Sequence, residues 1–131
     1  MSEPHTHTHG TLPIIQRFIA VYKLWHEWRD HFPKKSRYTL GGKIDALFLD
    51  TIGFLFTASY LSREQKLLVL QRAGSKLDLL KFFLQVAWEL KALDNKKYIA
   101  LSEPLVEIGR MLGGWIRQVT IPPGESRAVK K

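Results

Sequence analysis

The sequence has no cysteine and no long uninterrupted apolar segment, and each absence excludes a class of protein. Without cysteine the chain has no disulfide, no thiolate nucleophile and none of the usual zinc sites. The most apolar stretch is broken by Asp50 and Thr51, which leaves no segment long enough to cross a bilayer. Residues 1–10 are polar and rich in histidine, unlike a secretory signal. We therefore expect no membrane span and a cytoplasmic location, although a chain without cysteine is compatible with any compartment.

Motifs for catalysis are missing as well. No serine lies in a nucleophile elbow, no glycine-rich loop follows a strand, and no His-Glu pair has metal-ligand spacing. His26 and Asp30 are four residues apart and can pair, as on any helix surface. His5, His7 and His9 alternate with threonine in the leader, which lacks the fixed geometry of a metal site. We therefore expect a protein that is not an enzyme and that has no cofactor and no metal site.

Positive charge is present in excess, with 20 lysines and arginines against 12 aspartates and glutamates and a net charge of +8. The excess is not confined to the C-terminal tail, because residues 1–120 keep 17 basic against 11 acidic side chains. A basic folded body predicts a polyanionic partner, above all nucleic acid. The alternative is that the charge serves solubility alone.

Apolar residues recur at helical spacing in four segments. The predicted helices span about residues 13–31, 40–60, 62–93 and 102–119. Four amphipathic helices with short connections predict an all-α fold, an antiparallel up-down four-helix bundle over residues 12–120. Residues 1–11 and 121–131 are expected to be a disordered leader and a disordered basic tail.

Details of the helices give further expectations. Ser62 and Gln65 have the spacing of a capping box at the start of the third predicted helix. Asp94 and Asn95 are expected to end that helix, and the fourth is expected to start near Ser102, with Pro104 in its first turn. The first predicted helix has an apolar stripe of Ile14, Phe18, Val21, Trp25 and Trp28, and Leu68 and Leu90 are predicted on the buried side of the third.

Basic side chains on the third and fourth predicted helices are candidates for phosphate contacts. Arg72 and Lys76 lie one turn apart beside apolar residues, so either their stems reach past these residues to water or the charge is used at a groove or subunit boundary. Arg110 and Arg117 share a helix face with a glycine between them, which suits phosphates. The alternative for Arg110 is a surface pair with Glu107.

Two other groups complete the candidates for nucleic-acid binding. Lys34, Lys35 and Arg37 lie beside Tyr38, whose ring can stack on a base, although a solvated basic loop explains them equally well. Lys81 lies on a face of mixed charge and adds positive potential.

Glycines in the fourth predicted helix indicate close packing. Each interior glycine costs about 1 kcal/mol relative to alanine. Gly109 and Gly113, with Trp115 on the same helix, are therefore predicted to contact another helix, either inside the bundle or between subunits.

Several stretches resemble one superfamily. The residues concerned are Tyr22-Lys23-Leu24, Phe32-Pro33-Lys34, Arg37-Tyr38, Leu40-Gly41, Leu80-Lys81-Phe82-Phe83-Leu84 and Glu107-Ile108-Gly109-Arg110-Met111-Leu112-Gly113-Gly114-Trp115-Ile116. Over residues 12–119 the chain resembles the four-helix-bundle proteins encoded in 23S rRNA intervening sequences. Within that superfamily it is most similar to the Avd family, the accessory variability determinants of diversity-generating retroelements.

This resemblance implies a ring-like homopentamer without catalytic activity. It implies binding to the reverse transcriptase of the retroelement and to its template RNA, or to DNA or an RNA–DNA hybrid, in support of mutagenic retrohoming. Lys81 and Arg110 match basic positions of the family. Gln85 stands where Avd proteins can carry a second basic residue. The alternatives are an intervening-sequence protein of unknown role and a protein-interaction scaffold that binds no nucleic acid.

Overall fold

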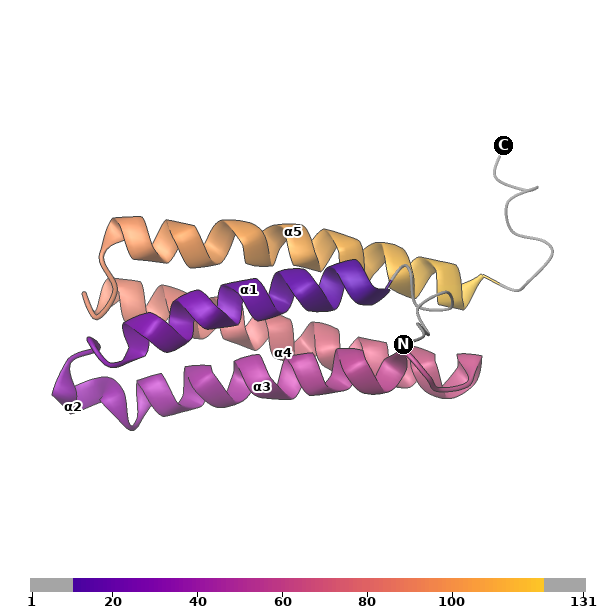
Figure 1. Ribbon diagram of the computed structural model, residues 1–131, viewed down its shortest axis with the longest axis horizontal. Coiled ribbons are helices and arrows are strands. Elements are labelled where there is room, and N and C mark those ends of the chain that lie inside the picture. The colour runs from indigo at the N-terminus through magenta and orange to yellow at the C-terminus, as the bar shows by residue number, and fades with distance from the viewer. Residues whose placement is uncertain (1–10, 122–131) are drawn as a thin grey trace, which may run out of the picture.

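The computed structural model describes residues 11–121, and this part of the chain is an all-helical bundle without strands (Figure 1). The helices are α1 (Thr11–Arg29), α2 (Lys34–Arg37), α3 (Leu40–Ala58), α4 (Arg63–Glu89) and α5 (Asn95–Thr120). Helix α2 is a single turn, and the other four lie side by side. Short turns reverse the chain between them, so that α1 and α4 each pack against both α3 and α5. The predicted leader, with its histidines, and the tail beyond residue 121 lie outside the described residues.

One apolar core runs along the bundle axis. From α1 it takes Ile14, Phe18, Val21 and Trp25, the stripe that the sequence predicts. The Trp25 ring stacks on Phe48 of α3 at 6.2 Å between centroids and meets Phe32 edge-on at 5.4 Å. Large aromatic rings bury much apolar surface and prefer such offset or edge-to-face pairs. Helices α1 and α3 are therefore joined by an aromatic cluster near the α1–α3 turn.

A carboxylate fixes the register of α1 against α3. Asp45 of α3 accepts hydrogen bonds from Tyr22 Oη at 2.9 Å and Trp25 Nε1 at 3.1 Å, and it pairs with Arg29 at 3.3 Å. Burial, and then the neighbouring Asp45 carboxylate, raise the pKa of the Tyr22 hydroxyl. The three donors lie on successive turns of α1, so a shift of α1 by one turn would break all three contacts.

The starts of α4 and α5 differ from the predicted ones. Ser62 precedes α4 but makes no capping hydrogen bond through its side chain, so the expected capping box is absent. Asp94 begins α5 instead of ending α4, because its carboxylate accepts a hydrogen bond from Lys97 N at 2.8 Å. Aspartate is a strong N-cap residue, and this cap starts α5 seven residues before Ser102. Pro104, predicted in the first turn, lies inside the helix.

Helix α4 ends at Glu89, and the backbone after it forms a tight turn held by hydrogen bonds. Lys91 N donates to Trp88 O at 3.0 Å, and Ala92 N donates to Ala87 O at 2.8 Å. This is the Schellman motif, in which the residue after the C-cap has left-handed backbone geometry. Glycine is the usual residue at that position. Here Lys91 adopts that conformation, with φ of 64°.

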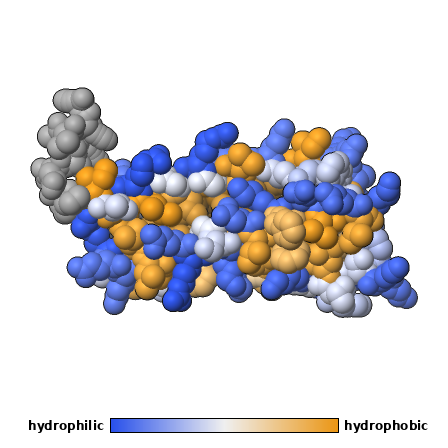
Figure 2. Space-filling view, turned by 180° about the vertical axis from the view of Figure 1, so that it is seen from behind, coloured by the Kyte–Doolittle hydropathy of each residue, from blue (hydrophilic) through white to orange (hydrophobic). Residues whose placement is uncertain are grey.

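The outer side of α4 carries a second apolar stripe. The buried side of the helix consists of Leu70, Ala73, Leu77, Leu80, Leu84 and Ala87. Leu68, Leu79 and Phe82 lie on the opposite side and are exposed, and Figure 2, a view from behind, shows apolar side chains between polar ones. Because α4 has two apolar stripes, periodicity alone does not identify the inner one.

Two side chains predicted to be buried, Leu68 and Leu90, are in fact exposed. Leu68 lies on the side of α4 opposite its buried residues, and Leu90 directly follows the last residue of α4. No helix within residues 11–121 is long and apolar enough to cross a membrane.

Candidate nucleic-acid interface

The eight predicted phosphate-contacting residues do not gather on one surface of the chain. Lys34, Lys35 and Arg37 lie on or beside α2, at the end of the bundle where α1 turns into α3. Arg117 lies in the last turns of α5, at the other end (Figure 1). The remaining four lie between, on α4 and α5.

Three of the eight lie beside a carboxylate. The pairs are Lys76 with Asp50 at 3.7 Å, Lys81 with Asp78 at 3.8 Å, and Arg110 with Glu107 at 2.9 Å. The Arg110–Glu107 pair is the predicted alternative to phosphate binding. Such exposed pairs contribute little to stability, and the basic partner remains accessible to a stronger anion. Arg72 is exposed beside the outer apolar stripe of α4, and among the described residues it has no salt bridge.

The cations around α2 divide into two kinds. Arg37 is half-buried, and its Nη2 donates to the carbonyl oxygen of Phe32 at 3.2 Å, so it holds the α1–α3 turn. Lys34 and Lys35 are exposed, and the Tyr38 ring next to them is 77% exposed. The two lysines and the ring therefore remain open to a ligand.

The glycines of α5 do not bring a second backbone close within the chain. A Cβ added at Gly109 would lie 3.7 Å from Leu77 Cδ2 and 3.8 Å from Lys81 Nζ, which are ordinary side-chain contacts. At Gly113 it would meet only Arg117, from the same helix, at 3.9 Å. Trp115 is half-buried against the core. Gly109 therefore faces α4 at ordinary side-chain distances, and a closer approach of another helix, inside the bundle or between subunits, stays a prediction.

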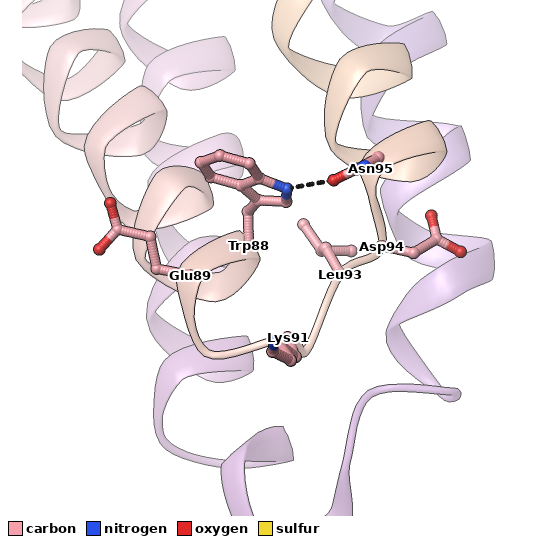
Figure 3. Close-up of a pocket in the computed structure, with 6 residues that line it drawn as sticks. All are labelled: Trp88, Glu89, Lys91, Leu93, Asp94 and Asn95. Atoms are coloured by element: carbon pink, nitrogen blue, oxygen red, sulfur yellow. Dashed lines mark hydrogen bonds between the residues drawn. The ribbon is translucent and has the colours of Figure 1, made fainter.

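Positive charge is dense at the end of the bundle that carries both α2 and the α4–α5 turn. Residues 30–38 and 89–97, here called the basic end, contain six basic and three acidic side chains. Lys91 and Lys96 are exposed there, and Lys97 Nζ lies 5.7 Å from the centroid of the Trp28 ring. A depression of about 510 Å³ opens at the same end and is lined by Trp88, Glu89, Lys91, Leu93, Asp94 and Asn95 (Figure 3).

A comparison with protein families identifies the chain. The model of the bAvd-like family matches residues 12–119, which include nearly all of the four long helices. The chain belongs to the bAvd-like family. No curated protein and no solved structure gives a significant match.

Membership of the bAvd-like family agrees with the resemblance found in the sequence. The family is of the Avd type, whose members are accessory proteins and not catalysts. The glycine-rich stretch that resembles Avd, residues 107–116, lies on α5, and Lys81 extends from α4 toward it at Gly109. Within residues 11–121 no group of three or more acidic or histidine side chains is placed to hold a metal ion.

Sequence reasoning did not include Trp88, Tyr98, Lys91 and Lys96 among the candidates. These residues flank Asp94 and Asn95, which the sequence predicts at the end of a helix, with the segment up to Ser102 as a connection. The signal available was the density of lysine around an Asp-Asn pair, since aspartate before a lysine-rich segment also starts helices.

Proposed function

We propose that this bAvd-like protein is a non-catalytic accessory subunit of a diversity-generating retroelement. In this role it binds the reverse transcriptase and the template RNA, or the DNA or RNA–DNA hybrid made from it, and supports mutagenic retrohoming. The family match over residues 12–119 carries the proposal. The excess of positive charge in the bundle supports it, because residues 11–121 contain 17 basic against 10 acidic side chains.

The proposal includes assembly into a homopentameric ring. Leu79 and Phe82 on the outer side of α4 are 42% and 53% exposed, and Leu68 is exposed on the same side of the helix. Exposed apolar stripes of this kind mark interaction sites. Light scattering on the purified chain should give the mass of five subunits, and Leu79→Glu with Phe82→Glu should give monomers. A monomeric mass for the unmodified chain would contradict the ring.

Binding to RNA should be dominated by phosphate contacts, with little discrimination between sequences. A single-stranded RNA that contacts several lysines and arginines releases counterions, so its affinity falls steeply as salt rises. We expect the dissociation constant for template RNA to rise by about tenfold or more between about 50 mM and 200 mM salt. An affinity that does not change with salt would contradict a phosphate-dominated surface.

A protein-interaction scaffold is the second candidate, because three of the eight predicted cations already lie beside carboxylates. Replacing Arg72, Lys76, Lys81 and Arg110 with glutamate distinguishes the two functions. Under the proposed function this variant loses RNA binding. Under the scaffold function the unmodified chain binds no RNA at low salt, and docking to the protein partner survives the replacement.

Co-purification from the native host tests the partners directly. The proposed function predicts that a reverse transcriptase and the template RNA are recovered together with the chain. Recovery of ribosomal RNA without a reverse transcriptase would instead support the intervening-sequence protein, which shares the four-helix fold.

A further inference from the structure

We propose that the Trp88–Tyr98 pair at the basic end is a stacking site for an unpaired nucleotide, with Lys91 and Lys96 contacting the adjacent phosphates. The site rests on the proposed function, since it specifies which form of nucleic acid the protein holds and where. Its ligand is a single-stranded segment of RNA or DNA.

The aromatic pair provides a preformed platform. The rings of Trp88 and Tyr98 lie nearly parallel, with centroids 5.0 Å apart and an interplanar angle of 11°. Trp88 Nε1 donates to Asn95 Oδ1 at 2.7 Å, which fixes the rotation of the indole (Figure 3). Trp88 is 37% exposed and borders the depression, whereas Tyr98 is half-buried behind it. A base that enters the depression therefore meets an indole whose orientation is already set.

The backbone of Lys91 supports a role for its side chain. Left-handed geometry is unfavourable for residues other than glycine, and glycine is the usual residue at this position of a Schellman turn. Here Lys91 occupies that position, with φ of 64°, and it also lines the depression. Strained residues of this kind concentrate at ligand-binding sites. The lysine places an ammonium group at the depression, which the sterically preferred glycine lacks.

Both acidic residues that line the depression already accept a hydrogen bond from the chain. Glu89 accepts a hydrogen bond from Gln85 Nε2 at 3.0 Å, and Asp94 caps α5. In Figure 3 their carboxylates point outward on opposite sides of the indole. Lys91 and Lys96 have no salt bridge within residues 11–121.

The same end of the bundle extends the positive surface beyond the depression. Lys34 and Lys35 of α2 are exposed there, close in sequence to the exposed Tyr38 ring. Cations that follow a phosphate backbone, together with aromatic rings, are the combination that binds single strands without reading their sequence. In a duplex both faces of each base are already covered, so the ring selects unpaired segments.

The first measurement compares a fluorescent 12-nucleotide RNA of mixed sequence with its duplex and with DNA of the same sequence. We expect single strands of either sugar to bind more tightly than the duplex. Trp88→Leu should weaken binding of the single strand by roughly tenfold, since loss of one stacked base has that effect. Phe56→Leu is the matched control, because Phe56 is an exposed ring, paired with Tyr60, at the other end of the bundle, and it should leave binding unchanged.

The second measurement uses Lys91→Gly, which separates binding from folding. Glycine relieves the left-handed backbone, so the melting temperature should stay the same or rise, while affinity for the single strand falls severalfold. The slope of log affinity against log salt should decrease by about 0.7, as expected for one lost phosphate contact. Unchanged affinity and slope for this variant would overturn the role of Lys91.

Fluorescence gives a readout that does not depend on the stability of Trp88→Leu. A base stacked on Trp88 quenches its emission, and Trp88→Phe keeps a ring but removes that signal. Quenching by the RNA that persists fully in Trp88→Phe would place the nucleotide elsewhere and overturn the stacking site. Binding that survives both Trp88→Leu and Lys91→Gly would overturn this site and leave the proposed function standing. Failure of the unmodified chain to bind any RNA would overturn both.

Discussion

The two ends of the bundle use similar residues in different ways. Each end has a turn between helices, exposed aromatic rings and several cations. At the end where α3 turns into α4, the Arg63 guanidinium donates to the carbonyl oxygen of Ile121, and Arg117 folds back over the glycines of its own helix. At the basic end, Lys91 and Lys96 form no salt bridge within residues 11–121. Residue type alone therefore does not mark an interface, and what distinguishes the ends is whether the charge is already used by the fold.

The packing below the two ends differs as well. Near the basic end a single carboxylate, Asp45, receives three donors from α1. At the opposite end the contact between Arg63 and Ile121 is an exposed hydrogen bond. The basic end therefore has more side-chain contacts between α1 and α3 beneath it, which suits a site that presents fixed rings and charges.

The largest expected effect is on stability, from Asp45→Ala. This change leaves the indole N–H of Trp25 without a partner and breaks the pairs with Tyr22 and Arg29, so it should lower the free energy of unfolding by about 3 kcal/mol. Arg63→Ala at the opposite end should cost less than about 0.5 kcal/mol. Urea denaturation measures both, and equal losses would remove the proposed difference in support.

Next in size is the effect of charge reversal on RNA binding. Lys34→Glu with Lys35→Glu at the basic end should weaken binding of a single strand at low salt by about tenfold or more. Arg63→Glu with Lys66→Glu, in the first turn of α4, changes the net charge equally at the other end. Fluorescence anisotropy should show a much smaller loss for this second pair. Similar losses would mean that total charge, and not its position, determines affinity.

A smaller difference is expected between the two helix starts. Asp94→Ala removes the carboxylate that accepts from Lys97 N, and it should destabilise the bundle by about 1 kcal/mol. Ser62→Ala should have almost no effect, because the hydroxyl makes no capping hydrogen bond. Thermal unfolding of the two variants checks this, and a loss for Ser62→Ala equal to that of Asp94→Ala would show that Ser62 does cap α4.

The smallest effect concerns high pH. The pKa of Tyr22 is raised in the folded state, so the protonated hydroxyl favours the fold. Its contribution is complete below the ordinary value of 10.0 and is lost as pH rises through the folded pKa. The free energy of unfolding should therefore fall less steeply above that value in Tyr22→Phe than in the unmodified chain. Urea denaturation of the two chains at increasing pH measures this difference.

Sequence periodicity predicts the helices better than it predicts their outer faces. The stripe from Ile14 to Trp25 is buried as expected, because α1 has one apolar side. Helix α4 has two, and the predicted stripe included Leu68 and Leu90, which are exposed. Distinguishing the two stripes requires knowing which helix packs on each side, and that information is tertiary.

The sequence identifies the basic residues by type, but it does not show which of them are free to bind a ligand. Lys76 stands out in the sequence, and only the folded chain brings Asp50 of α3 to 3.7 Å from it. The sequence does not indicate that Lys91 has a left-handed backbone, because glycine is the residue that usually marks such a turn. The stack of Trp88 on Tyr98 depends on Asp94 starting α5 early, which brings residues ten apart onto facing turns.

The polarity of the chain has a practical consequence for how this protein is handled. Thr11 and Ile121, the first and last residues described, both lie at the end opposite α2 (Figure 1). Helix α5 alone has 26 residues and spans about 39 Å, so a tag or surface anchor joined after residue 121 attaches far from Trp88. A chain anchored in this way would expose its basic end to the solution, where a single-stranded nucleic acid can reach it.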